Sequence, residues 1–153
     1  MSTAEPGLGF EYLAEHLDVG IGTAHRSVTR LRLSGLVVEQ WRVNKKSLLE
    51  LVVHGARYVY YVKPGTMTRG LPTADAAPPL NEQVSPAELP FVWPDPLGTV
   101  RGISVQPLHE SAPRVAQENE AFYELLALTD AMRVGQARVR GLAELELRRK
   151  LAA

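Results

Sequence analysis

Residues Phe10–Val37 read FEYLAEHLDVGIGTAHRSVTRLRLSGLV, a pattern typical of two short helices joined by a tight turn. The apolar side chains of the first segment recur at three- and four-residue spacing, which places them on one helix face: Phe10, Leu13, Ala14 and Leu17. The string Asp18-Val19-Gly20-Ile21-Gly22 breaks this pattern, because aspartate and glycine tolerate the positive φ of a sharp turn. A second helix is expected to follow.

The second helix is predicted to have one apolar and one basic side. At about 100° per residue, a narrow arc contains Ala24, Val28, Leu31 and Gly35. The opposite side contains His25, Arg26, Thr29 and Arg30, with Arg32 toward its edge. A DNA-reading helix needs such an arrangement, since it is anchored on one side and presents donors to bases and phosphates on the other.

The string LAEHLDVGIGTAHRSVTRL resembles, without a gap, the helix-turn-helix pattern of bacterial transcriptional regulators. Its continuation, RLRLSGLV, resembles the helix end that leads into the wing of winged-helix repressors of the multiple-antibiotic-resistance type. Asp18 stands where this pattern most often has glycine, and Gly20 where a serine or threonine usually caps the recognition helix. Aspartate tolerates the left-handed conformation and glycine is a weaker cap, so both fit. The resemblance implies a DNA-binding domain with a recognition helix at about Thr23–Ser34.

Charge is distributed unevenly along the chain. The formal net charge of the 153 residues is zero, which argues against a protein held on nucleic acid by bulk charge alone. Between Asp18 and Lys46, however, Asp18 and Glu39 are outnumbered by Arg26, Arg30, Arg32, Arg42, Lys45 and Lys46. Residues 66–110 show the inverse balance. The positive field is therefore expected to be local to the helix-turn-helix stretch.

Other compositional features limit the function classes. Apolar residues make up 45% of the chain, enough for a core. The chain has no cysteine, so disulfides and thiolate metal sites are excluded. It has no apolar run long enough to span a membrane and no signal-peptide pattern at its start, so we expect a cytoplasmic protein without a membrane partner.

The stretch on either side of the motif departs from a full winged-helix domain. Residues 1–9, MSTAEPGLG, cannot supply the helix that normally precedes the pair. After the motif we expect a strand over Val38–Val43, an Asn44 N-cap and a helix from Lys45 to about His54 that stops at Gly55. A further strand is predicted over Tyr58–Val62, ended by Pro64-Gly65.

A proline-rich segment follows. Residues 65–96 are predicted to be loop-like, anchored against the domain by Leu71 and Leu80. Arg69 either grips a phosphate or a minor groove, or is a structural or exposed arginine. A hairpin is expected from Phe91–Trp93 and Thr99–Val105, joined by a type I turn over Asp95–Gly98.

The chain past Pro107 is predicted to be helical. Ser111 caps a first piece, and a second helix runs from about Asn119 to Arg133. Its apolar stripe contains Phe122, Leu125, Leu126, Thr129 and Met132. Gly135 interrupts, and a charged last helix follows.

The segment Asp130–Arg140 carries unusual charge for a surface helix. With RGLPT, VWPD and TVRG it resembles a small bacterial family of winged-helix proteins of unknown role, associated with neighbouring nucleotidyltransferase-like proteins; this resemblance gives no residue a role. Asp130 and Arg133 are placed to pair on a helix, while Arg138 and Arg140 either hold an acidic partner surface or pair with Glu144.

Patterns of catalysis and metal binding are missing from the sequence. The histidines are scattered, without ligand spacing on a predicted helix: His16, His25, His54 and His109. No Gly-rich phosphate loop or nucleophile elbow occurs. We therefore expect neither an enzyme nor a protein with a cofactor or metal.

These observations predict an α+β chain with three parts: a winged helix-turn-helix domain over residues 1–64, a proline-rich segment with a β-hairpin over 65–110, and a C-terminal helical pair over 111–153. The predicted function is sequence-specific binding of double-stranded DNA as a transcriptional regulator. We expect a homodimer joined by the C-terminal helices, because one such helix binds too weakly for a genome. The predicted DNA contacts are Thr23, His25, Arg26, Thr29 and Arg30 in the major groove, and Arg32, Arg42, Lys45 and Lys46 on phosphates.

Two alternatives remain. The first is a protein-interaction module, such as an antitoxin-like neutralising partner of a neighbouring enzyme, with the winged helix as scaffold and the C-terminal half as interface. Zero net charge and the missing first helix favour it. The second is a ligand-responsive regulator in which a pocket is lined by Tyr58, Tyr60, Tyr61 and Trp93.

Overall fold

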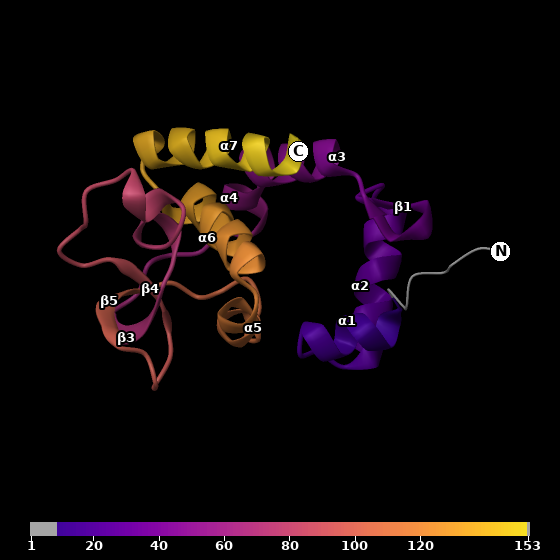
Figure 1. Ribbon diagram of the computed structural model, residues 1–153, viewed down its shortest axis with the longest axis horizontal. Helices are drawn as coiled ribbons and strands as arrows, with labels where there is room; N and C mark the ends of the chain where they lie inside the picture. Colours follow the sequence, from indigo (N-terminus) through magenta and orange to yellow (C-terminus); the bar gives the residue numbers. More distant parts are fainter. Residues whose placement is uncertain (1–8, 153) are drawn as a thin grey trace. The chain divides into compact units, whose positions relative to one another are not determined.

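The computed structural model describes residues 9–152, except for the side chain of Gln40, and confirms a mixed α and β chain (Figure 1). The prediction about a missing first helix falls mainly on residues 1–8, which lie outside the described residues. The chain divides into two compact units, Met1–Leu48 and Leu49–Ala153. This division falls within helix α3 (Lys45–Glu50) and differs from the boundaries expected after residues 64 and 110.

The first unit begins with two helices whose ends follow the predicted turn chemistry. Helices α1 (Phe10–His16) and α2 (Ile21–Leu33) are joined at Asp18, which has a φ of 52°. Asp18 N–H bonds to Glu15 O at 3.3 Å and the next amide bonds to Ala14 O at 3.0 Å, which is the hydrogen-bond pattern of a Schellman motif. Gly20 has a φ of −65°, so aspartate alone supplies the left-handed residue of this turn.

The end of α2 repeats this motif at Gly35, whose φ is 77°. Gly35 N–H bonds to Arg32 O at 3.1 Å, and Leu36 N–H bonds to Leu31 O at 2.9 Å. The left-handed residue is glycine here because a side chain in this conformation would be strained. The sequence Gly35-Leu36-Val37 therefore forms the C-terminal cap of α2 and the start of the next element.

The predicted strand Val38–Val43 is wrong as a continuous element. Strand β1 (Val37–Val38) and strand β2 (Arg42–Val43) pair antiparallel, with a 3-10 turn over Glu39–Trp41 between them. The chain reverses at Trp41, whose φ of 63° is unusual for an aromatic residue. The alternating pattern of this stretch thus belongs to a miniature hairpin.

The helix after Asn44 runs further than predicted. Asn44 Oδ1 accepts from Ser47 N–H at 3.2 Å, which confirms the predicted N-cap. Helix α3 continues through a π-helical turn, Leu51–Gly55, into α4 (Ala56–Val59). The stop expected at Gly55 and the strand expected over Tyr58–Val62 are therefore wrong.

The second unit contains a small closed barrel of three strands, β3 (Met67–Pro72), β4 (Phe91–Pro94) and β5 (Val100–Ser104). Strand β3 pairs antiparallel with both others, and β4 pairs parallel with β5. The loop expected over residues 65–96 thus contains a strand, as well as 3-10 turns at 74–76 and 80–82. Leu80 is buried, as its predicted anchoring role requires, and Leu71 is half-buried.

The predicted hairpin between β4 and β5 is wrong in its pairing and right in its turn. The two strands lie parallel instead of folding back on each other. Between them, Gly98 N–H bonds to Asp95 O at 2.9 Å and Leu97 N–H bonds to Asp95 Oδ1 at 2.9 Å. Aspartate, proline and glycine therefore form the expected tight turn.

Three helices complete the second unit: α5 (Ala112–Glu118), α6 (Glu120–Val134) and α7 (Ala137–Ala152). Asn119 caps α6 by accepting from Phe122 N–H at 3.0 Å, and Gly135 ends it. Of the predicted stripe, Met132 is buried, Leu125 packs against the core, and Phe122, Leu126 and Thr129 are partly buried. The other buried apolar residues of α6 are Ala127, Leu128 and Ala131.

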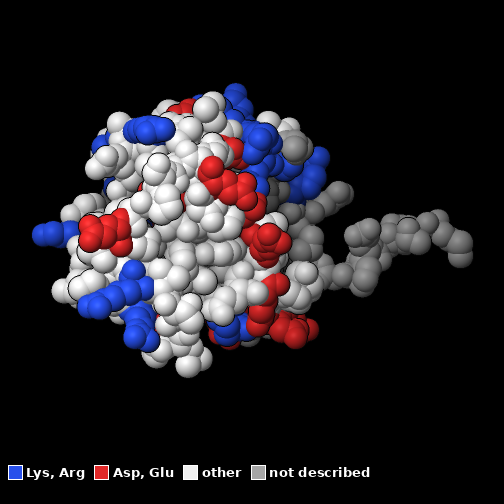
Figure 2. All heavy atoms as spheres, turned by 60° about the vertical axis from the view of Figure 1, so that its left-hand side comes forward, with Lys and Arg blue, Asp and Glu red and all other residues white. Residues whose placement is uncertain are grey.

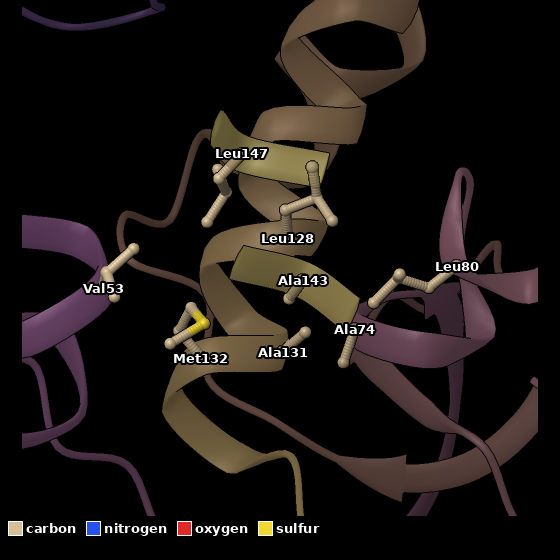
Figure 3. Close-up of a cluster of buried hydrophobic side chains, with 8 residues drawn as sticks. All are labelled: Val53, Ala74, Leu80, Leu128, Ala131, Met132, Ala143 and Leu147. Carbon is tan, nitrogen blue, oxygen red and sulfur yellow. The ribbon is translucent and has the colours of Figure 1, made fainter. Parts of the chain in front are cut away.

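The core of the second unit lies where α6 and α7 meet the chain before and after β3 (Figure 3). Its buried side chains come from five elements, the π-helical turn, the two 3-10 turns, α6 and α7: Val53, Ala74, Leu80, Leu128, Ala131, Met132, Ala143 and Leu147. In the described part of the chain, no helix is long and apolar enough to cross a bilayer.

Candidate nucleic-acid interface

Helix α2 is anchored in the first unit by a narrow apolar side. Ala24 and Val28 are buried, one helical turn apart, and Leu31 at the end of the arc is partly exposed. Because these side chains are small, the helix axis can lie close to its neighbours. The predicted anchoring face is confirmed in its N-terminal half, and its C-terminal half is more exposed.

The side of α2 opposite Ala24 and Val28 is polar and exposed. Arg26, Thr29 and Arg30 all point away from the buried side. The Arg26 guanidinium donates to Thr23 Oγ1 at 3.2 Å, which holds it along the first turn. The side chains of Thr29 and Arg30 make no hydrogen bond or ion pair with another described residue. This side therefore presents exposed donors, of which one is held by a bond to Thr23.

Charge on α2 has a single sign. The helix carries Arg26, Arg30 and Arg32 and not one acidic residue. Acidic residues of the described part of this unit lie on α1, in the turn and in the hairpin, at Glu11, Glu15, Asp18 and Glu39. On a helix, guanidinium groups three and four residues apart would repel one another, so a nearby anion would relieve the repulsion.

His25 and Arg32 lie on the flank of α2, where they contact other side chains. The His25 ring stacks on Phe10 of α1 with ring centroids 3.5 Å apart. Arg32 Cζ lies 4.9 Å from the centroid of the Trp41 ring, and Phe10 meets that ring edge-on at 5.0 Å. His25 is exposed, and one face of its ring is engaged with α1.

An aromatic cluster therefore connects the three elements of this unit. We define it as Phe10, His25 and Trp41, from α1, α2 and the hairpin turn. Sequence reasoning missed its role, because the contact between Phe10 and Trp41 depends on the positive φ of Trp41. Leu33 was also missed: it is 85% exposed on the same side as Arg26.

Three of the four predicted phosphate contacts lie in and after the hairpin. Arg42 is exposed on β2, and Lys45 and Lys46 are exposed in the first turn of α3. Two cations at the start of a helix are destabilising, because this is the positive end of the helix dipole. A phosphate bound near them would offset this cost, because an anion is stabilised there. The structure thus brings these residues into the same unit as α2 and leaves their side chains accessible.

A second polar cluster lies buried in the second unit and is structural in character. Asp130 Oδ2 accepts from Thr73 Oγ1 at 2.7 Å and from Trp93 Nε1 at 2.6 Å, and Oδ1 accepts from Arg133 at 2.7 Å. Burial raises the pKa of Asp130 above its ordinary value, against the opposing effect of these donors and the Arg133 charge. The predicted Asp130–Arg133 pair is confirmed.

Arg133 extends this cluster to two loops. Its guanidinium also donates to Tyr60 O at 2.9 Å and to Gln106 O at 3.2 Å. Because these hydrogen bonds all lie inside the fold, this cluster positions segments and does not present a reactive group. The pairing suggested for Arg140 is wrong, since Arg140 donates to Gly135 O and Glu144 pairs with Arg148.

The C-terminal helices carry an ion-pair network. Glu146 accepts from Gln83 at 2.9 Å and from Arg149, and Lys150 pairs with Glu124. Burial alone would raise the pKa of Glu146, but the hydrogen bonds and the charges of Arg149 and Lys150 lower it. On the face in Figure 2, basic and acidic side chains are interspersed among uncharged ones.

The remaining sequence hypotheses concern ligands. Trp93 is buried while Tyr58, Tyr60 and Tyr61 are exposed, so these four residues do not enclose the expected pocket. No group of three or more histidines or carboxylates among the described residues could hold a metal ion. Comparison with profiles of protein families, with curated proteins and with solved structures gives no match.

Proposed function

We propose that this chain is a sequence-specific DNA-binding regulator that reads the major groove with α2. The observation that carries the proposal is a helix anchored by Ala24 and Val28 whose opposite side exposes Arg26, Thr29 and Arg30. The diameter of an α-helix matches the major groove, and arginine is the side chain that most often reads guanine. Arg26 and Arg30 are the proposed readers, each contributing about 1–3 kcal/mol of discrimination.

Phosphate contacts are assigned to the basic residues around the reading helix. Arg32, Arg42, Lys45 and Lys46 are exposed in the same unit, and Thr23 and His25 are assigned to the edges of the groove. Contacts of this kind fix orientation and carry no sequence information. The miniature hairpin β1–β2 takes the place of a wing in this proposal.

The regulator is proposed to act in the cytoplasm as a homodimer. One recognition helix reads few base pairs, and pairing of two half-sites supplies the missing discrimination. The C-terminal helices are the proposed dimer contact. Sedimentation of the full chain, free and on DNA, tests this part, and a monomer in both states at tens of micromolar would reject it.

The first experiment is a fluorescence-anisotropy titration of the full chain with its own upstream DNA and with a scrambled duplex, at two salt concentrations. We expect a preference of about 10³ or more, with steep salt dependence. Arg26→Ala and Arg30→Ala should remove the preference. Lys46→Ala, the matched control, should weaken both duplexes alike. Equal binding of both duplexes by the wild-type chain would contradict the proposal.

A second candidate function is a protein-interaction module, such as a neutralising partner of a neighbouring enzyme. It is favoured by the run Tyr58–Tyr61, in which Tyr58 is 69% and Tyr61 is 72% exposed. Contiguous exposed aromatic side chains are typical of protein contacts. Loss of co-purification with the neighbouring gene product on Tyr58→Ser and Tyr61→Ser, with DNA binding weak and unselective, would favour this candidate.

A further inference from the structure

The barrel contains a repeated Arg-Gly pair. Strand β3 carries Arg69-Gly70 and strand β5 carries Arg101-Gly102. In the antiparallel register, Arg69 lies directly opposite Arg101. Residues opposite each other on antiparallel strands project from the same face of a sheet, and both arginines are exposed. Two cations therefore stand side by side on the outer surface of the barrel.

The glycines determine which way the arginines point. Gly70 and Gly102 are buried, and a Cβ at Gly70 would lie 1.8 Å from Trp93 O. A Cβ at Gly102 would lie 2.0 Å from Pro90 O. Barrel closure thus requires glycine at both inner positions. Since side chains alternate along a strand, the preceding arginines must project outward.

Arg69 and Arg101 occupy backbone positions that are close together across the two strands. Arg69 O accepts from Asp95 N–H at 3.1 Å, so the backbone of Arg69 bonds toward β4. Hydrogen bonds alternate between the two sides of a strand, and the Arg69–Arg101 pair is therefore of the non-hydrogen-bonded type, in which side chains are closest. Like charges placed directly opposite destabilise a sheet.

No described side chain compensates this repulsion. Neither Arg69 nor Arg101 forms a hydrogen bond or ion pair through its guanidinium with another described residue. The carboxylate of Asp95, in the turn after β4, accepts from Leu97 N–H within that turn. The pair thus places two exposed positive charges, without a countercharge from a described residue, on two paired strands of the barrel.

We infer that the Arg69–Arg101 pair binds the phosphate backbone of nucleic acid as a second, sequence-independent contact. Neither arginine lines the cavities of about 670 Å³ and 770 Å³ in this unit. An outer barrel surface buries little of a small anion, whereas a polyanion crosses it with successive charges. Guanidinium forks match phosphate oxygens. The inference rests on the proposed DNA-binding function and assigns it a contact outside α2.

The test measures duplex affinity of the full chain against salt. The double variant Arg69→Gln, Arg101→Gln should lower affinity about tenfold for every duplex at low salt and flatten the log–log salt dependence by about 1–2, since each phosphate contact contributes about 0.9. Preference between duplexes should persist. The variant Lys63→Gln removes a charge from an exposed position of the same unit that no proposal assigns, and it should change neither quantity by more than about twofold.

Thermal unfolding separates folding from binding. Removing like charges should leave the melting temperature of the Arg69→Gln, Arg101→Gln variant unchanged or raised. Wild-type affinity and salt dependence in this variant, with loss of selectivity in Arg26→Ala and Arg30→Ala, would overturn the inference and leave the proposed function intact. Loss in the barrel variant without any effect of the α2 variants would support the inference and reject α2 as reader. Polyglutamate, as a probe for acidic protein surfaces, is titrated with the same variants. If the Arg69→Gln, Arg101→Gln variant loses polyglutamate binding and keeps duplex binding, the pair contacts an acidic protein surface and the inference is overturned.

Discussion

The indole N–H of Trp93 donates to Oδ2 of Asp130 at 2.6 Å, and both residues are only 1% exposed. This bond joins β4 of the barrel to α6. Thr73 and Arg133 bind the same carboxylate, so one side chain holds together segments that are far apart in the sequence. The stability of the second unit is therefore expected to depend strongly on Asp130.

Asp130→Asn should destabilise the second unit by about 3–5 kcal/mol, because it leaves the Arg133 guanidinium, 5% exposed, without its buried countercharge. Trp41→Phe leaves Trp93 as the only tryptophan, so urea unfolding followed by fluorescence in that background reports on this unit. Glu144→Gln breaks the surface pair with Arg148 and should cost less than about 1 kcal/mol. Similar costs for both variants would contradict a structural role for the cluster.

Tyr123 should lose its proton at a higher pH than an exposed tyrosine. Burial raises the pKa of Tyr123 from 10.0 to about 12, and its hydroxyl donates to Pro72 O. The folded pKa lies above the unfolded one, so this contribution to stability is complete below about pH 10 and is lost as the pH rises toward 12. The difference in ultraviolet absorbance between the wild type and Tyr123→Phe, recorded against pH, isolates this titration. A midpoint near 10 would contradict the burial of the hydroxyl.

Gly70→Ala should destabilise the second unit by about 3 kcal/mol or more, because its Cβ would collide with backbone instead of a movable side chain. Gly141→Ala is the control: it lies in α7, its Cβ would meet no heavy atom within 4 Å, and it should stabilise by about 0.5–1 kcal/mol. Denaturant unfolding in the single-tryptophan background compares the two. A neutral Gly70→Ala would mean that the barrel is not closed at this point.

Gly35→Ala should destabilise the first unit by about 1–2 kcal/mol, since its φ of 77° strains any side chain. Gly22→Ala lies inside α2, where the added Cβ meets only the mobile end of Arg26 at 3.3 Å, and should be stabilising by about 0.5–1 kcal/mol. Hydrogen exchange at the Val28 amide distinguishes the two effects. Equal protection in both variants would argue against Gly35 as the stop of α2.

Local turn and cap chemistry could be predicted from the sequence. Asp18 in the left-handed region, the Asn44 cap and the Asp95–Gly98 turn all depend on residues within a few positions of one another. The predicted type of secondary structure was wrong where tertiary packing determined it. Tyr58–Val62 has strand composition, yet α4 begins at Ala56 because the helix from Lys45 continues through a π-helical turn.

The candidate site was predictable in part for the same reason. The exposed placement of Arg26 and Arg30 follows from helical periodicity alone, whereas the stacking of His25 on Phe10 requires the angle between α1 and α2. The pairing of Arg69 with Arg101 depends on the strand register, which joins residues from opposite ends of the proline-rich segment. No local pattern fixes that register.

The alternation of arginine and glycine in the barrel also disfavours a one-residue slip of β3 against β5 during folding. A slip of either strand by one residue would exchange its inner and outer faces, forcing a guanidinium group into an interior that does not admit even a methyl group beside Gly70. Misaligned pairings are thus penalised at both strands independently. The same two dipeptides that charge the surface also oppose a one-residue shift in the register of the barrel strands.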